Sequence, residues 1–344
     1  MSVDASNALL AWYAVDKRKL PWRATGGETA DPYRVWLSEV MLQQTTVAAV
    51  RPYFEKFTSR WPNVEALAAA EDSEVMTAWA GLGYYARARN LLACARAVAG
   101  GHRGRFPDDE AELRKLPGIG RYTAAAISSI AYGRRAVVVD GNVERVVSRL
   151  FAVKEALPGA REKLYALADR LTPSERCGDH AQAMMDLGAT ICTPRKPECG
   201  RCPLSYACTA RMEGQPELYP VKAPKAAKPR KRGVAYWLEH DGHVMLVRRP
   251  ARGLLGGMLA LPTGAWGADA EPENGAPAAA EWKEAGEIDH VFTHFALNLR
   301  VHCAVAEARG AGDIWWPIGE LEQAGLPTVF AKAAARGIAW TEAT

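Results

Sequence analysis

Apolar residues recur at helical spacing along the first two thirds of the chain. One helix is predicted to begin at Asp31-Pro32, a capping residue followed by a proline in the first turn. The apolar positions behind it lie three or four residues apart: Tyr33, Trp36, Leu37, Val40 and Met41. Similar spacing predicts helices over roughly 84–99, 122–131, 143–151 and 161–171. Residues 1–214 are therefore predicted to form a mainly α-helical domain.

The pattern changes after residue 233. Residues 234–247, VAYWLEHDGHVMLV, hold two apolar runs around Asp241-Gly242, a dipeptide that favours a hairpin turn. Residues 290–306 alternate like a strand, and stretches around 318–324 and 328–335 predict helices. We therefore expect residues 234–344 to form a second, α+β domain.

Two segments lack such periodicity. Residues 215–233 carry four prolines and six basic residues with a single acid, which predicts an extended, positively charged linker. Residues 265–281 are rich in alanine, glycine, proline and glutamate and are expected to form a mobile loop.

Composition sets only broad bounds on function. A length of 344 residues suits two domains, and a net charge of +4 permits nucleic acid binding without requiring it. No apolar run is long enough to span a membrane, and the first residues lack the basic and apolar regions of a secretory signal. A cytoplasmic protein without membrane contact is the expectation.

Four of the seven cysteines crowd into one short segment. Cys192, Cys199, Cys202 and Cys208 follow the spacing C-x6-C-x2-C-x5-C, in which thiolates can reach one metal centre. The spacing alone leaves a structural zinc ion and an iron–sulfur cluster as equal alternatives.

The string LPGIGRYTA at residues 116–124 places two glycines before a run of helix formers. Gly118 and Gly120 permit close approach of another molecule, and the free N–H groups at the start of the next helix point at an anion. This helix-hairpin-helix signature predicts a site for a DNA phosphate.

Two acids stand in notable strings. Asp140 lies in VVVDGNVERV, where an isolated aspartate is ordinarily a helix cap. Glu39 lies in SEVMLQQT, about 120° from the apolar stripe of its predicted helix, where a lone glutamate is ordinarily solvated. Position and residue type alone leave both acids without an assigned function.

The order of these motifs carries a family resemblance. A hairpin, an aspartate about twenty residues on and then the four-cysteine loop resemble the helix-hairpin-helix DNA glycosylases of the endonuclease III superfamily. The strings SEVMLQQT, LPWR at 20–23, GLGYYARARN at 81–90 and FTHF at 292–295 resemble its adenine-specific, MutY-type branch. GLLGGMLALP at 253–262 resembles the Nudix fold. The resemblance covers nearly the whole chain and implies a [4Fe–4S] cluster, with a monovalent cation at the hairpin.

The resemblance also implies the chemistry. Glu39 would protonate adenine at N7, because adenine leaves readily only when protonated, and Asp140 would stabilise the cationic sugar. Tyr122 and Asn142 would orient these groups, with the Tyr122 hydroxyl near the aspartate. Relatives that cut the strand carry a lysine at the position of Tyr122, and a phenol cannot form the imine they use. A monofunctional glycosylase is therefore predicted.

The remaining residue roles are implied by the resemblance as three groups. The adenine pocket would be lined by Arg18, Leu20, Trp22, Arg23 and Gln182. The wedge that fills the gap left by the everted base would be Gln44, Thr45, Leu82 and Tyr84. The reader of 8-oxoguanine would be Phe292, Thr293 and His294, with threonine in place of the family's serine.

The predicted partner is double-stranded DNA with adenine opposite 8-oxoguanine, bound by a monomer. The metal-binding run of a Nudix hydrolase does not follow Gly264, so no pyrophosphatase activity is expected. Two alternatives remain: a glycosylase acting on thymine or uracil opposite guanine, and a non-catalytic DNA-binding module.

Overall fold

The chain divides into two compact units. The structure, a computed structural model, describes residues 2–25, 28–224, 227–250, 253–268, 275–310 and 314–344. The first unit comprises residues 1–70 and 90–225, and the second comprises residues 71–89 and 226–344. The predicted domain boundaries, 1–214, 215–233 and 234–344, stay a prediction.

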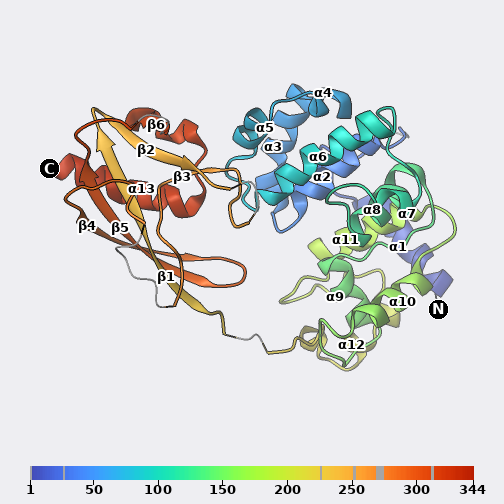
Figure 1. The fold of residues 1–344 in the computed structure, drawn as a ribbon. Coiled ribbons are helices and arrows are strands. Elements are labelled where there is room, and N and C mark those ends of the chain that lie inside the picture. Colours follow the sequence, from blue (N-terminus) through green and yellow to red (C-terminus); the bar gives the residue numbers. More distant parts are fainter. Residues whose placement is uncertain (1, 26–27, 225–226, 251–252, 269–274, 311–313) are drawn as a thin grey trace. The chain divides into compact units, whose positions relative to one another are not determined.

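The first unit is helical (Figure 1). Its helices are α1 (Ser2–Asp16), α2 (Pro32–Leu42), α3 (Val47–Arg60), α4 (Val64–Ala68), most of α6 (Ala86–Gly101), α7 (Glu110–Leu113), α8 (Arg121–Tyr132), α9 (Gly141–Leu150), α10 (Arg161–Leu171), α11 (Cys177–Thr190) and α12 (Thr209–Met212). The helices predicted at 84–99, 122–131, 143–151 and 161–171 are confirmed within two residues at each end, as α6, α8, α9 and α10. No individual range was predicted for α1, α3, α4, α7, α11 or α12.

Local chemistry places these helices. The Asp31 side chain accepts a hydrogen bond from the Tyr33 N–H at 2.9 Å, which starts α2 as predicted. Helix α8 packs against α2 and α11, and α9 packs against α10 and α11. Their apolar faces are fully buried around residues such as Leu164 and Leu187. The four helices α2, α8, α9 and α11 carry the candidate site.

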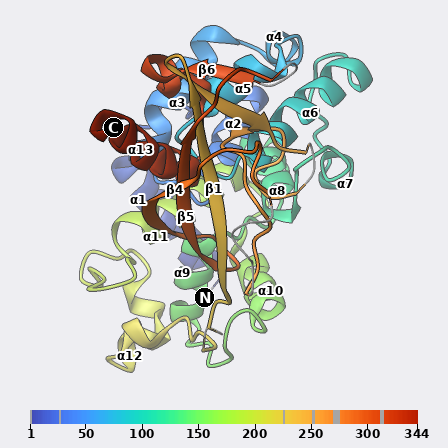
Figure 2. The ribbon, with the colours of Figure 1, turned by 60° about the vertical axis from the view of Figure 1, so that its left-hand side comes forward.

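The second unit is built on a mixed sheet. Its strands are β1 (Arg230–His240), β2 (His243–Arg248), β3 (Leu259–Ala260), β4 (Lys283–Val291), β5 (Ala296–Val305) and β6 (Ile314–Pro317). The order is β3-β2-β1-β5-β4, with β6 also on β2; β1 and β5 run parallel and the other pairs antiparallel. Helix α13 (Thr328–Ala343) packs along β4 and β5 (Figure 2). The α+β prediction is confirmed, and α5 (Asp72–Trp79) belongs to the same unit.

Four local predictions can be compared with the structure. The turn at Asp241-Gly242 is confirmed, with both residues at positive φ. Within the predicted linker, residues 216–218 form a 3-10 turn and residues 230–233 pair with β5. Residues 290–306 are two strands joined by a tight turn, since Phe292 N–H donates to the Phe295 carbonyl at 2.8 Å. Part of the expected loop at 265–281, residues 269–274, lies outside the described residues.

Within the described residues, no helix combines the length and apolar character needed to cross a bilayer. The stretch predicted as helical at 318–324 is a 3-10 helix, and the stretch at 328–335 is the first half of α13.

Candidate active site

Glu39 is buried rather than solvated. It lies on α2 with 6 % of its surface exposed, and the Tyr122 hydroxyl donates a hydrogen bond to its Oε2 at 2.5 Å. The same hydroxyl lies 3.3 Å from the Met185 sulfur. Helices α2, α8 and α11 thus enclose one carboxyl group in a largely apolar site.

Burial raises the pKa of Glu39 to about 7. The hydrogen bond from Tyr122 and the charge of Arg23 act in the opposite direction, and the charge of Asp140 adds to the rise. A carboxyl group with this pKa is protonated in a substantial fraction of molecules at neutral pH. It can therefore donate a proton to a bound base.

Tyr122 supplies a neutral hydroxyl. Burial, together with the nearby charges of Glu39 and Asp140, raises its pKa well above the ordinary value. Its hydrogen bond goes to Glu39, whereas the sequence predicted a hydroxyl beside the aspartate. The charge of Asp140 still acts on it, which indicates that the three groups share one site.

Asp140 is half-buried at the start of α9. Its Oδ1 accepts from the backbone N–H groups of Asn142 at 2.9 Å and Val143 at 2.7 Å, and its Oδ2 accepts from Asn142 Nδ2 at 2.8 Å. Burial raises the pKa of Asp140, while these three hydrogen bonds stabilise the ionised form. Asp140 is therefore both the N-cap residue of α9 and the candidate catalytic carboxylate.

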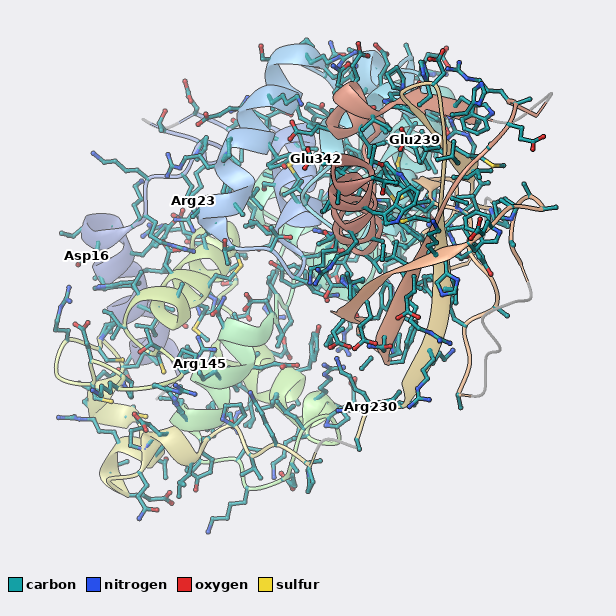
Figure 3. All side chains as sticks on the ribbon, turned by 90° about the vertical axis from the view of Figure 1, so that its left-hand side faces the viewer. Asp16, Arg23, Arg145, Arg230, Glu239 and Glu342 are labelled. Carbon is teal, nitrogen blue, oxygen red and sulfur yellow. The ribbon has the colours of Figure 1, made fainter. Side chains whose placement is uncertain are left out.

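A chain of contacts joins Asp140 to the cysteine loop. Arg145 donates to Asn142 Oδ1 at 2.8 Å, to the Gly188 carbonyl at 2.7 Å and to the Cys192 carbonyl at 2.7 Å. A Cβ atom on Gly188 would lie 2.6 Å from the Asn142 side chain, so only glycine permits this approach of α11 to α9. Figure 3 marks Arg145 on α9.

The residues predicted for the adenine pocket meet at one cavity. Arg18, Leu20, Trp22, Arg23 and Gln182 line it together with Glu39. Asp186, on α11 and fully buried, accepts two hydrogen bonds from the Arg23 guanidinium at 2.6 and 2.7 Å and one from Arg18 Nε at 2.6 Å. Figure 3 labels Arg23 near α11.

The glycine hairpin precedes α8 without a side-chain cap. Gly118 has φ +75°, and a Cβ there would lie 2.7 Å from that of Asn90, so both backbone conformation and space require glycine. Gly120 is the N-cap residue of α8, and no side chain bonds the first N–H groups of the helix. These N–H groups are suited to donate hydrogen bonds to a phosphate.

The four predicted metal ligands line one cavity with Arg149. Burial raises the pKa of the Cys202 thiol to about 12, and the other three cysteines add to the rise, so a cation is needed to hold the group as thiolates. Arg149 is buried and donates to the carbonyls of Thr193 at 2.7 Å and Pro194 at 3.0 Å. Among the described residues, no three potential ligands converge on a single ion. Four thiols around one cavity form a ligand set that fits an iron–sulfur cluster and also a structural zinc ion.

The predicted wedge residues differ in exposure. Gln44 is exposed and Thr45 half-buried directly after α2, and Gln44 has φ 58°. In residues 71–89, Tyr84 is 49 % exposed with φ 48°, and Arg87 stacks on its ring. Leu82 is 7 % exposed, so its side chain is covered in this structure.

The predicted lesion reader is the turn between β4 and β5. Thr293 and His294 are exposed at its tip. Phe292 is half-buried and packs against Phe295 and Trp266, with ring centroids 4.8 and 6.0 Å apart, and Lys228 donates to its carbonyl at 2.8 Å. The aromatic residues fix the turn and leave the polar pair free of the core.

Sequence reasoning missed Asp186, Arg145 and Arg149. Asp186 carries a charge within the otherwise apolar string MMDLGA at 184–189, and that interruption is a signal that could have found it. Arg145 and Arg149 lie away from the apolar stripe of α9, where an arginine gives no such signal. Their partners lie 40 or more residues away in sequence, so pattern alone could not identify them.

Comparison with known families defines the class of protein. Residues 37–172 match the HhH-GPD superfamily of base excision DNA repair proteins, residues 192–208 match the iron–sulfur binding domain of endonuclease III, and residues 233–336 match the NUDIX domain. The chain is thus a glycosylase of base excision repair with an iron–sulfur loop and a Nudix-like domain.

Individual relatives specify the family. The human adenine DNA glycosylase is 34 % identical over 94 % of this chain and 72 % of its own length, and that of Buchnera aphidicola from Schizaphis graminum is 31 % identical over 94 % and 95 %. The Mycolicibacterium smegmatis protein of that name is 42 % identical over 60 % of this chain and 70 % of its own. The chain belongs to the adenine DNA glycosylase family.

Solved structures agree on the fold. A thermostable thymine-DNA glycosylase is 33 % identical, with a TM-score of 0.55 over 60 % of this chain and 95 % of its own. A trapped endonuclease III–DNA covalent intermediate has a TM-score of 0.52 over 61 % and 95 %, at 24 % identity, which shows the helical fold alone.

Proposed function

We propose that the protein hydrolyses the N-glycosidic bond of adenine paired with 8-oxoguanine, and with guanine, in double-stranded DNA. The observation that carries the proposal is a pair of acids in one site: the buried Glu39, with a pKa of about 7, and the half-buried Asp140, held by three hydrogen bonds. One acid suits protonation of a leaving base and the other suits stabilisation of a cation.

The chemistry follows from these two environments. Glu39 donates its proton to N7 of the everted adenine, which makes the base a neutral leaving group. Asp140 is aimed from the start of α9, where Asn142 fixes its carboxylate, and stabilises positive charge at C1′ as the bond breaks. Tyr122 holds Glu39 in place by its hydroxyl. Glu39 and Asp140 can fill these roles when water attacks C1′ directly and also when Asp140 attacks first and water then displaces it.

The pocket supports adenine as the base. Gln182 can pair with an adenine edge through its amide, and Trp22 and Leu20 provide flat and apolar walls beside Glu39. The base must leave the duplex to reach them, and Gln44, Thr45, Leu82 and Tyr84 would fill the gap. Leu82 must emerge from its buried position to take part.

The second unit would identify the opposite base. An enzyme that removes undamaged adenine must confirm its partner, or it would attack ordinary pairs with thymine. The exposed Thr293 and His294 on a rigid turn support the role of an 8-oxoguanine reader. DNA phosphates would bind at Gly118–Gly120 and along the basic residues near 228–232, so affinity should fall steeply with salt.

The iron–sulfur loop would hold a [4Fe–4S] cluster on Cys192, Cys199, Cys202 and Cys208. When bound, the cluster supplies a rigid cross-link of the loop, and the chain's own Arg149 fixes the loop carbonyls around it. A monovalent cation at the hairpin remains a prediction.

A cleavage assay tests the proposal. A duplex with one adenine opposite 8-oxoguanine should be cut only after hot alkali, because a monofunctional enzyme leaves an intact abasic strand. Glu39→Gln and Asp140→Asn should each slow excision by roughly 10²–10⁴-fold. Glu55→Gln, an exposed glutamate on α3, is the matched control.

Three outcomes would contradict the proposal. Excision of thymine or uracil opposite guanine, with adenine untouched, would identify the alternative glycosylase. Binding of the duplex without any excision would identify a DNA-binding module. Wild-type rates in both acid variants would remove the assigned mechanism.

A further inference from the structure

Two arginines stand beside the carboxyl group that must carry a proton. Arg18 and Arg23 line the same cavity as Glu39. The charge of Arg23 favours the ionised form of Glu39 and so opposes its role as a proton donor. A negative charge close to Arg23 would reduce this lowering of the Glu39 pKa and help Glu39 to act as an acid near neutral pH.

Asp186 binds both guanidinium groups. Arg23 Nη1 and Nη2 donate to its two oxygens at 2.7 and 2.6 Å, Arg18 Nε donates to Oδ1 at 2.6 Å, and the Arg18 backbone N–H donates to Oδ2 at 3.0 Å. Arg23 also donates to the Arg18 carbonyl at 3.1 Å. The side chain of Asp186 is fully buried, and each of its two oxygens accepts two hydrogen bonds from the arginines rather than from water.

The clamp also changes the charge that lines the cavity of Glu39. Two guanidinium groups and one carboxylate leave a single net positive charge beside Glu39 rather than two. Burial alone would raise the pKa of Asp186, but the hydrogen bonds and charges of Arg23 and Arg18 outweigh it and lower the pKa. The negative charge of Asp186 is therefore present throughout the working range of the enzyme.

We propose that Asp186 is a positioning residue for acid catalysis, which clamps Arg18 and Arg23 and cancels one of their charges so that Glu39 keeps its proton at neutral pH. The clamp also fixes two walls of the base pocket. The proposal rests on the proposed function, in which Glu39 is the acid.

Other charged groups face this site from each packed element. Tyr13 on α1 lies near Asp186, Arg18 and Arg23, and burial raises its pKa to about 12, so it stays neutral. Tyr122 on α8 and Asp140 on α9 face Glu39 itself. Asp179 on α11 acts on Tyr13 and is paired with Arg176 at the surface. Of these groups, Asp186 alone bonds to both arginines.

The test is the pH dependence of single-turnover adenine excision from a saturated A·8-oxoguanine duplex. Asp186→Asn removes the charge and should move the alkaline limb of the profile to lower pH by about one unit, which slows excision about tenfold at pH 8 and little at pH 5.5. A structural defect would slow excision equally at every pH. Asp179→Asn removes the same charge from the same helix and is the matched control.

Two charge-balanced variants complete the test. Arg18→Gln alone should move the alkaline limb in the opposite direction. This variant keeps the bidentate bond of Asp186 to Arg23, so it remains available as a test if Asp186→Asn does not fold. Asp186→Asn combined with Arg18→Gln restores the net charge and should return the limb towards its original position. A limb that stays in place in the folded variants would overturn the proposal, whereas wild-type excision by Glu39→Gln would instead overturn the assignment of Glu39 as the acid, and absence of adenine excision by the wild-type protein would overturn the proposed function.

Discussion

At the scale of single residues, environment rather than residue type gives Glu39 its chemistry. The sequence placed it off the apolar stripe of its own helix, where a glutamate is ordinarily solvated, yet α8 and α11 cover it. The helical pattern of α2 could be predicted because it is local. The burial of Glu39 could not, because it depends on residues 83 or more positions away.

The buried Glu39 should weaken the fold as pH rises. Its pKa is about 7 in the folded protein and near the ordinary 4.5 in the unfolded chain, so the folded state binds the proton more tightly and loses stability between these values. The side chain of Glu39→Gln cannot ionise, so the variant does not lose this stability. The free energy of unfolding of the variant relative to the wild type should therefore increase by about 1–3 kcal/mol between pH 5 and pH 8. Urea unfolding at both pH values measures the difference, with Glu55→Gln as control; an equal difference at both would contradict it.

Removal of the Tyr122 hydroxyl should affect the pH profile in a defined direction. Its hydrogen bond to Glu39 lowers the pKa of that acid, so Tyr122→Phe should raise it and move the alkaline limb of excision to higher pH. The plateau rate should fall roughly tenfold, because Glu39 loses the bond that orients it. Single-turnover excision from pH 5.5 to 9 measures both effects. A limb displaced to lower pH would show that the hydroxyl acts otherwise.

At the scale of elements, caps and apolar spacing predicted five helices of the first unit: α2, α6, α8, α9 and α10. Asp31 and Asp140 both begin helices as their sequence context indicated. The sheet was harder to predict, because β1 pairs in parallel with β5, which lies more than 50 residues further along the chain. Pairing with β5 places residues 230–233 in a strand, although their sequence indicated a linker. Family resemblance, rather than periodicity, identified the residues of the site.

The two roles of Asp140 can be separated. Asp140→Ala removes the side-chain acceptor that caps α9 and should destabilise the protein by about 1 kcal/mol. Asp140→Asn keeps an oxygen for the N–H groups of Asn142 and Val143 and should lose only a fraction of that. Both should lose adenine excision. Thermal unfolding together with the cleavage assay measures the two roles, and equal stability of the two variants would indicate that the cap contributes little.

At the scale of the whole molecule, the roles proposed above are distributed over both units, and the wedge residues Leu82 and Tyr84 belong to the second unit. The acids, the base pocket and the iron–sulfur loop lie in the first unit, and the exposed turn at 292–295 lies in the second. Composition indicated two domains, but neither charge nor length indicated their tasks. The strings shared with the adenine glycosylases made that assignment possible.

Loss of the His294 imidazole should affect recognition more than chemistry. His294→Ala should reduce the preference for A·8-oxoguanine over A·G roughly tenfold in equilibrium binding, as expected for one lost base contact. Single-turnover excision from saturated A·8-oxoguanine should stay within about threefold of wild type. His243→Ala, at the start of β2, is the matched control. Unchanged preference would assign lesion reading to another part of the unit.

The left-handed backbones of Gln44 and Tyr84 have a kinetic consequence. Non-glycine residues at positive φ are strained, and folding has already fixed them in the free protein. If Gln44 and Tyr84 enter the base stack, DNA binding costs little further backbone conformational entropy at these two residues. Insertion would then be limited by opening of the duplex, so its rate should track the stability of the neighbouring base pairs.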